Sequence, residues 1–259
     1  MKVRSGYGGI SMPDTPHRFA AVSLFPEMFS AIAEWGVTGR AREQGLWSLS
    51  LHNPRDHATD RHGTIDDRPY GGGPGMVMQA PVLDRALQAA REAVGGGGRV
   101  VALTPQGRPF SHGLARELLA DRATVLVAGR YEGMDERFLQ RSVDVEVSVG
   151  DFVVSGGELP AMLVIDAMVR LIPGVLGHSA SADEDSFVEG LLDCPHFTRP
   201  EDYEGLGVPA VLMSGDHGAI ARWRRAQAIR RTLDRRPDLL GLDDVSAEDW
   251  KLLKEWELD

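Results

Sequence analysis

Short apolar runs alternate with stretches of helical spacing along most of this chain of 259 residues. The apolar run FAAVSLF at 19–25 predicts a buried strand, and the stretch from a proline to a glycine at 26–36 predicts a helix. The strictly alternating LWSLSL at 46–51 predicts a second strand. Helical spacing of valine, leucine and alanine at 81–94 predicts a further helix, which a run of four glycines ends.

From residue 100 onward the pattern becomes a repeated unit of strand, sharp loop and helix. The expected strand segments with their loops are 100–107, 124–133 and 143–160, and the helices that follow them are 111–120, 134–141 and 161–172. Apolar strands that alternate with helices are typical of an α/β fold with a mainly parallel sheet.

In parallel sheets, ligands bind at the carboxyl ends of the strands. The loops expected there are Thr104–Gly107, Gly129–Gly133 and Ser155–Gly157. If their strands are neighbours, these loops place glycines and backbone amides around one point. That arrangement suits a ligand recognised by main-chain hydrogen bonds, such as an adenine ring. Ordinary tight turns explain one such loop easily and three less well.

The formal charge of −10 at pH 7 argues against general coating of nucleic acid or of anionic membranes. The helix-compatible run 217–236 departs from this balance, since seven arginines and one aspartate give it a formal charge of +6. Arg224, Arg231 and Arg235 share one face of that helix, which is either a site for phosphates or a solvated surface. The small, acidic segment 177–186 is a candidate linker.

Cysteine usage and hydropathy bear on the compartment. The single cysteine excludes an internal disulfide and fits the reducing cytoplasm, and no apolar run approaches the eighteen residues of a membrane span. Cys194 is more typical of a small buried residue than of a nucleophile, because no base is fixed beside it by the sequence.

Other motifs leave alternatives open. The glycine-rich stretch DDRPYGGGPGMVM at 66–78 does not match the standard phosphate-binding loops, so it is either a mobile surface loop or a binding surface. The segment from His52 to His62 holds three histidines and two aspartates, but their spacing matches no standard metal site. A solvated polar loop is the favoured interpretation of that segment.

Several long strings together identify a family. DDRPYGGGPGMVM, PQG, GRYEGMDER, SVGDFVVSGGELPAM, PGVLGHSASADEDSF and EGLLDCPHFTRP occur in this order. The chain from about Phe19 to Leu240 thereby closely resembles bacterial tRNA (guanine-N(1)-)-methyltransferases of the SPOUT class (TrmD type). The resemblance implies an α/β parallel sheet with a deep trefoil knot at roughly 103–160 and a small C-terminal helical domain. It also implies S-adenosylmethionine as methyl donor, the guanosine at tRNA position 37 as acceptor, and a homodimer with active sites at the subunit interface.

The resemblance further implies a division of the chain and a set of site residues. The expected parts are a disordered leader or cloning remnant at 1–18, a knotted S-adenosylmethionine-binding domain at 19–176, a linker at 177–188 and a tRNA-binding helical domain at 189–259. Asp185, supplied by the opposite subunit, is the expected general base, and Arg170 the expected partner of the guanine. The expected cofactor-binding residues are Leu103, Pro105, Gly129, Tyr131, Glu132, Ser148, Val149, Gly150, Asp151, Phe152, Val153, Val154, Gly156 and Gly157.

The chemistry accounts for these residue types. Guanine N1 is a poor nucleophile until a carboxylate removes its proton, and a guanidinium stabilises the negative charge that then builds on the 6-oxo group. Family behaviour suggests a role for magnesium, but the sequence shows no clear site for it. Without the resemblance, Asp185 is interpreted as a solvated acid and Arg170 as a cation at a helix C-terminus. Two rival functions remain, an RNA-binding module without catalysis and a metal-dependent phosphohydrolase built on the His52–His62 segment.

Overall fold

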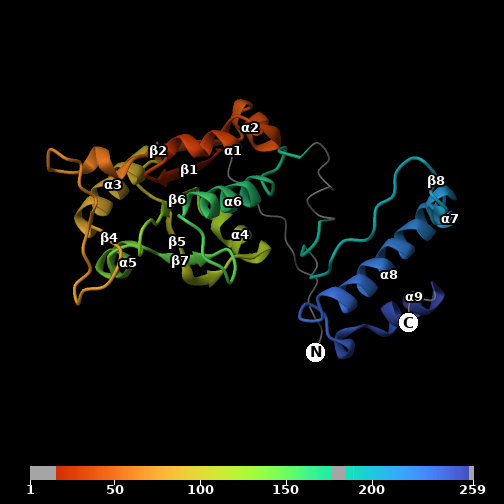
Figure 1. Ribbon diagram of the computed structural model, residues 1–259. Helices are drawn as coiled ribbons and strands as arrows, with labels where there is room; N and C mark the ends of the chain where they lie inside the picture. Colours follow the sequence, from red (N-terminus) through yellow and green to blue (C-terminus); the bar gives the residue numbers. More distant parts are fainter. Residues whose placement is uncertain (1–15, 177–184, 189, 257–259) are drawn as a thin grey trace. The chain divides into compact units, whose positions relative to one another are not determined.

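The computed structural model of the protein describes residues 16–176, 185–188 and 190–256. The chain divides into two compact units, with the boundary between Gly177 and His178 (Figure 1). Among the described residues, no helix is both long and apolar enough to cross a membrane. The expected leader and linker fall largely on 1–15 and 177–184, which lie outside the described residues.

The first unit is built on a five-stranded sheet in the order β2-β1-β6-β5-β7. All four neighbouring pairs are parallel, which confirms the predicted α/β fold with a parallel sheet. The strands are β1 (His17–Val22), β2 (Trp47–His52), β5 (Arg99–Pro109), β6 (Ala123–Ala128) and β7 (Val145–Ser148). β1 therefore begins two residues before the start expected for this domain.

Two hydrophobic cores lie on opposite faces of this sheet, because alternate residues of a strand point to opposite sides. One core joins the sheet to α4 (His112–Leu119) and α6 (Glu158–Val169). The other joins it to α3 (Ala80–Ala93) and α5 (Glu136–Ser142). The central strand β6 is buried along its whole length, as expected for a strand covered by helices on both faces.

The predicted single helix at 26–36 is wrong in its extent. The structure has a 3-10 turn, η1 (Pro26–Phe29), then the short α1 (Ser30–Ala33), and a separate α2 (Gly36–Glu43). Gly36 has a φ of 69°, a left-handed value that suits glycine, so the chain changes direction there and a new helix begins. The residues after it form a helix because Thr38 and Ala41 are buried and the Trp47 indole donates to the Thr38 carbonyl at 2.9 Å.

The predicted position of one loop is also corrected. Thr104–Gly107 lies inside β5, where the pairing with β7 shifts register between Leu103 and Arg108, and not after the end of the strand. A Cβ at Gly107 would collide with the backbone nitrogen of Val147, so this glycine allows the two strands to approach closely at the irregularity.

The remaining elements of the first unit are short. They are η2 (Pro54–His57) and a two-stranded antiparallel pair, β3 (Asp66–Asp67) and β4 (Val77–Met78), which brackets the glycine-rich stretch. The long apolar segment expected at 143–160 forms only the short β7 before a loop leads to α6.

The second unit is mainly helical. Its elements are β8 (Asp202–Tyr203), β9 (Leu206–Gly207), α7 (Ala210–Met213), α8 (His217–Arg235), η4 (Leu242–Asp244) and α9 (Ala247–Glu255). α8 matches the predicted basic helix, and the Asp216 side chain caps its start by accepting from the Ala219 amide at 3.0 Å. Ile229 of α8 and Leu253 of α9 are fully buried in one small hydrophobic core.

Candidate functional site

A cavity of about 520 Å³ opens beside the irregular part of β5 and at the carboxyl ends of β6 and β7. Residues 103–106 of β5 and the loops at 129–134 and 147–157 line it, so the three segments singled out from the sequence do converge on one point. Of the residues expected to bind the cofactor, all except Asp151 line this cavity. Asp151 is exposed and lies in the same loop, between lining residues.

Backbone atoms come unusually close to one another in the wall of this cavity. The Gly157 amide donates to the Gly129 carbonyl at 2.8 Å, which ties the loop before α6 to the loop after β6. A Cβ at Gly157 would lie 2.7 Å from both the Ala128 Cα and the Gly129 nitrogen. Only glycine fits at this crossing, because the atoms it meets belong to the backbone and cannot move aside.

A buried ion pair behind the cavity was not anticipated from the sequence. The Arg130 Nε lies 2.8 Å from Glu158 Oε2, and the Glu158 side chain is only 1% exposed. The Ser23 hydroxyl donates to the other oxygen of Glu158 at 3.0 Å, and Arg130 also donates to the Ser155 carbonyl at 3.0 Å. The pair therefore holds the 129–133 and 155–157 loops in a fixed relation, since a buried carboxylate needs such partners. In the sequence, only the charged residues Arg130 in GRYEG and Glu158 in GGELP could have indicated this ion pair.

The glycine-rich stretch packs against one of the cavity loops. The Met76 carbonyl accepts from the Glu132 amide at 2.9 Å, and the Met78 amide donates to the Gly133 carbonyl at 2.9 Å. A Cβ at Gly75 would collide with the Glu132 side chain, so a glycine is required at this contact. Glu132 itself lines the cavity. The glycine-rich stretch thus supports the rim of the cavity, whereas Tyr70 within it is fully exposed.

Tyr131 lies in the same rim with a φ of 61°, a value that few residues other than glycine adopt. Its side chain is 49% exposed and borders the cavity. Such left-handed backbone positions are often found at ligand-binding sites, where the surrounding structure holds them in place.

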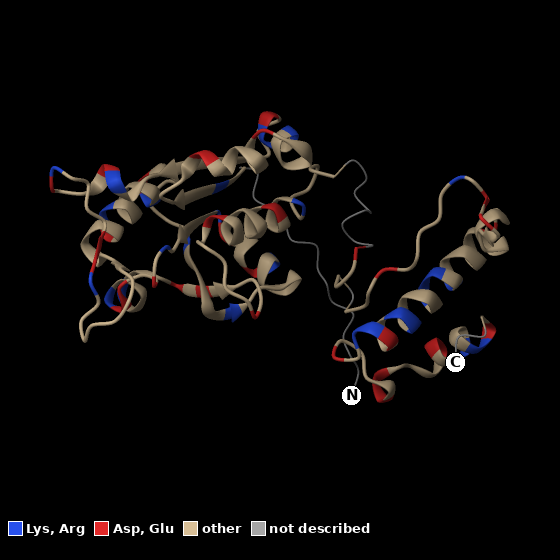
Figure 2. Cartoon of the chain, viewed as in Figure 1, with Lys and Arg blue, Asp and Glu red and all other residues tan. Residues whose placement is uncertain are grey.

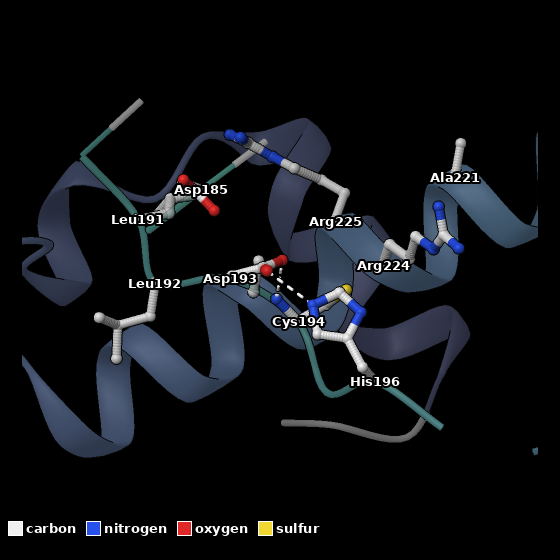
Figure 3. A pocket seen from close by; sticks show the side chains of 10 residues that line it. Asp185, Leu191, Leu192, Asp193, Cys194, His196, Ala221, Arg224 and Arg225 are labelled. Carbon is white, nitrogen blue, oxygen red and sulfur yellow. Dashed lines mark hydrogen bonds and ion pairs between the residues drawn. The ribbon is translucent and has the colours of Figure 1, made fainter. Parts of the chain in front are cut away.

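Neither of the two expected catalytic residues is among those that line this cavity. Arg170 is the C-terminal cap of α6, whereas Gly157, at the other end of that helix, lines the cavity. At about 1.5 Å per residue, the two ends of α6 are roughly 18 Å apart. Asp185 belongs to the second unit, where it is exposed and lines a separate cavity of about 400 Å³ (Figure 3).

This second cavity also holds Cys194, which is 5% exposed. Burial, helped by the neighbouring Asp193 carboxylate, raises the pKa of the Cys194 thiol. A protonated, buried thiol does not act as a nucleophile, in agreement with the sequence interpretation. The polar 52–62 segment is organised as a loop: Asp60 accepts from the His62 amide at 3.0 Å and from the Thr64 hydroxyl at 2.8 Å.

Figure 2 shows basic residues along α8, and the arginines of 217–236 fall into two groups according to their ion-pair partners. Four of the arginines in 217–236 form ion pairs with acids of their own unit: Arg222 with Glu255, Arg225 with Asp249, Arg230 with Asp234 and Arg236 with Asp238. For Arg224, Arg231 and Arg235, which share a helix face, the described part of the chain provides no ion pair of this kind. Their charge is available to an external anion.

Comparison with known proteins places the chain in a family. Residues 17–242 match the family model for tRNA (Guanine-1)-methyltransferase TrmD. The chain belongs to this family. Proteins named tRNA (guanine-N(1)-)-methyltransferase from Pseudomonas syringae, Pseudomonas fluorescens and Stutzerimonas stutzeri are 57%, 58% and 56% identical to it over 239 residues. Each alignment covers 92% of this chain and 96% of the relative. TrmD membership confirms the resemblance inferred from the sequence strings.

Proposed function

We propose that this TrmD family member methylates N1 of the guanosine at position 37 of tRNA, with S-adenosylmethionine as the methyl donor. The observation that carries the proposal is the cavity beside β5 and at the ends of β6 and β7, whose lining includes five glycines. A site of this kind recognises a nucleoside through main-chain hydrogen bonds. Family membership supplies the reaction class, tRNA guanine-N1 methylation.

The residues present fit this donor. The cavity of about 520 Å³ lies within the range of about 300–1,000 Å³ that is usual for small-molecule sites. Gly129, Gly156 and Gly157 line the cavity without side chains that would fill it, while Tyr131 and the Glu132 carboxylate suit a cationic ligand. When bound, S-adenosylmethionine supplies an electrophilic methyl group on a positively charged sulfur.

The roles of the remaining residues follow from what the acceptor needs. Asp185 removes the N1 proton of the guanine, and Arg170 stabilises the charge that develops on the 6-oxo group. Asp185 is exposed, as a base that must meet a macromolecular substrate has to be. The methyl donor needs no metal, and magnesium enters the proposal only as a possible aid, without an assigned site.

The surface of α6 supports a homodimer in this proposal. Leu159 and Leu163 are 54% and 49% exposed, although this helix is apolar nearly all round. Leu159, Leu163, Asp166 and Arg170 recur at spacings of four, three and four, so they lie on one face of the helix. Helices that are apolar on every side are normally buried, and a second copy packed around a two-fold axis would cover this face. An antiparallel copy of α6 would also bring Arg170 of one subunit toward the cavity end of the other.

The other parts of the proposal rest on the family and on charge. The stretch 103–160 forms the trefoil knot, in keeping with the close crossing of backbone at Gly107 and Gly157. Residues 189–259 form the tRNA-binding domain, in which Arg224, Arg231 and Arg235 contact phosphates. The segment 177–188 connects the two domains, and the enzyme works in the cytoplasm, where tRNA is modified.

The test is methylation of two tRNA transcripts that differ only in carrying guanosine or adenosine at position 37. We expect methyl transfer from S-adenosylmethionine to the guanosine transcript alone, and equal transfer to both would refute the assignment of the acceptor. Asp185→Ala should nearly abolish transfer and leave donor binding by calorimetry close to normal. Comparable turnover in that variant would remove Asp185 from the mechanism.

The same assays separate the rivals. An RNA-binding module without catalysis would give no heat with S-adenosylmethionine. A phosphohydrolase would show phosphatase activity that a chelator removes. No group of three close ligand atoms is found in the described 52–62 segment, which gives the phosphohydrolase no support.

A further inference from the structure

Three side chains of metal-binding type come together in the second unit, in the short sequence DCPH. An oxygen of Asp193, the sulfur of Cys194 and a ring nitrogen of His196 all lie within 4.8 Å of one another (Figure 3). All three residues line the cavity of about 400 Å³ that Asp185 also borders. Across the described ranges of the chain, this is the one group of three or more such residues.

We propose that Asp193, Cys194 and His196 form a binding site for a zinc-like divalent cation. Thiolate sulfur, imidazole nitrogen and carboxylate oxygen are the three kinds of ligand that zinc uses in proteins. Magnesium, by contrast, prefers oxygen ligands, so this site is distinct from any site for that ion. Three protein ligands leave a fourth position, open to the cavity, for water.

The present geometry needs only a small rearrangement, in which the widest separation closes and the short contact between His196 and Asp193 opens. Zinc bonds of about 2.0–2.3 Å in a tetrahedron place the ligand atoms roughly 3.5 Å apart, about 1 Å closer than the widest separation here. The His196 side chain is 73% exposed and can make this movement. Its Nε2 already lies 2.7 Å from Asp193 Oδ2, and a cation bound between the two atoms would replace the proton that they share. The other oxygen of Asp193 accepts from the Cys194 amide at 2.6 Å, which holds the carboxylate in orientation.

The charges around the site bear on how well it holds a cation. The Cys194 thiol must lose its proton to bind one. The positive charge of Arg224, which also lines the cavity, repels a cation. The carboxylates of Asp185 and Asp193 on the cavity wall offset that repulsion.

A cation in this position would fasten a segment that already has two anchors. The Leu192 amide donates to the Thr232 hydroxyl of α8 at 2.8 Å, and the Asp193 amide donates to the Ser186 hydroxyl at 3.0 Å. Ser186 follows Asp185 directly. Metal binding would thus restrict the chain next to the proposed general base.

Titration of the full-length protein with Co²⁺, a spectroscopic substitute for zinc, tests the site. Because Cys194 is the only cysteine, a near-ultraviolet thiolate-to-cobalt absorption band can come from no other residue. We expect this band at a stoichiometry of one per chain, its removal by added zinc, and its absence in Cys194→Ser. Absence of the band in the unaltered protein at alkaline pH overturns the proposal.

A second measurement keeps the test independent of the folding of that variant. Zinc affinity by calorimetry should fall at least about tenfold in His196→Gln, whose side chain is mostly exposed. His62→Gln, a change in an exposed loop of the first unit, is the matched control and should bind zinc as the unaltered protein does. Equal affinities in the two variants would mean that zinc binds elsewhere and would refute the assignment.

Discussion

The crossing of backbone at Gly157 gives the sharpest test of how the cavity is built. In Gly157→Ala, the new methyl group would lie 2.7 Å from two backbone atoms, about 0.7 Å inside the distance of ordinary contact. Neither atom can turn away, so α6 or the strand β6 must shift. Inserting one carbon into a tightly packed site of this kind destabilises a protein by about 1–3 kcal/mol.

The matched control is Gly97→Ala. A Cβ at Gly97 meets no atom within 4 Å, and no left-handed φ is recorded for it. Replacing a glycine where alanine fits without strain typically stabilises a protein by about 0.4–1 kcal/mol, because the unfolded chain loses freedom. The two substitutions are chemically identical, so the structure predicts opposite signs from their surroundings alone.

Thermal unfolding followed by circular dichroism measures the difference. For a protein of this size, each kcal/mol corresponds to roughly 2–4 °C in Tm, so the two variants should differ by several degrees. Gly157→Ala should also weaken the binding of S-adenosylmethionine, since the residue lines the cavity. If both variants melt alike and bind the donor alike, the close crossing described at Gly157 does not exist.

Three further outcomes follow from other parts of the molecule. Burial lowers the pKa of His17 from 6.5 to about 4. The free energy of unfolding should therefore be highest above pH 6.5, where His17 is neutral in both states. It should fall by up to about 3 kcal/mol as the pH decreases toward 4, because the unfolded state then binds a proton more readily. Denaturant titrations at several pH values should show a flatter profile in His17→Gln, and an unchanged profile would contradict the shift. Leu163→Glu should turn the proposed dimer into monomers in sedimentation, whereas Leu242→Glu, a control at a leucine that is 65% exposed against 49% for Leu163, should not. Arg231→Gln should reduce the salt dependence of tRNA binding by about one charge, while the ion-paired Arg230→Gln should change it less.

Much of the first unit could be predicted because its strands and helices differ clearly in pattern. β6 is a continuous apolar run, and α3 repeats its buried residues with helical spacing, so both elements are found where the sequence predicts them. The order of the strands in the sheet could not be predicted from these local patterns. Nothing in the local pattern of β1 indicates that it pairs with β2 on one side and β6 on the other.

The misplaced boundaries share a physical cause. Gly36 carries the usual signal for a helix end, but tertiary packing around Trp47 forms a new helix directly after it. Thr104–Gly107 contains a proline and a glycine and looks like a loop, yet pairing with β7 resumes at Arg108. In both cases contacts with distant residues override the local preference.

The site was predictable where glycines mark it and not where side chains assemble it. Gly129 and Gly157 indicated the cavity, and Gly157 is needed there for a close backbone approach. The pairing of Arg130 with Glu158 joins residues 28 positions apart, and the third partner, Ser23, is 135 positions from Glu158. Such a pairing depends on the topology of the sheet and leaves no mark in spacing.

The glycines in the cavity wall limit how this enzyme can evolve resistance. A compound that copies the donor in the proposed site would meet Gly129 and Gly157 in that wall. Altering the shape of the wall would require a bulkier residue at a glycine, and Gly157 has no space for one. Changes that exclude the compound should therefore arise mainly at flexible side chains of the rim, such as Tyr131 and Phe152, and inhibitors that avoid them should remain effective longer.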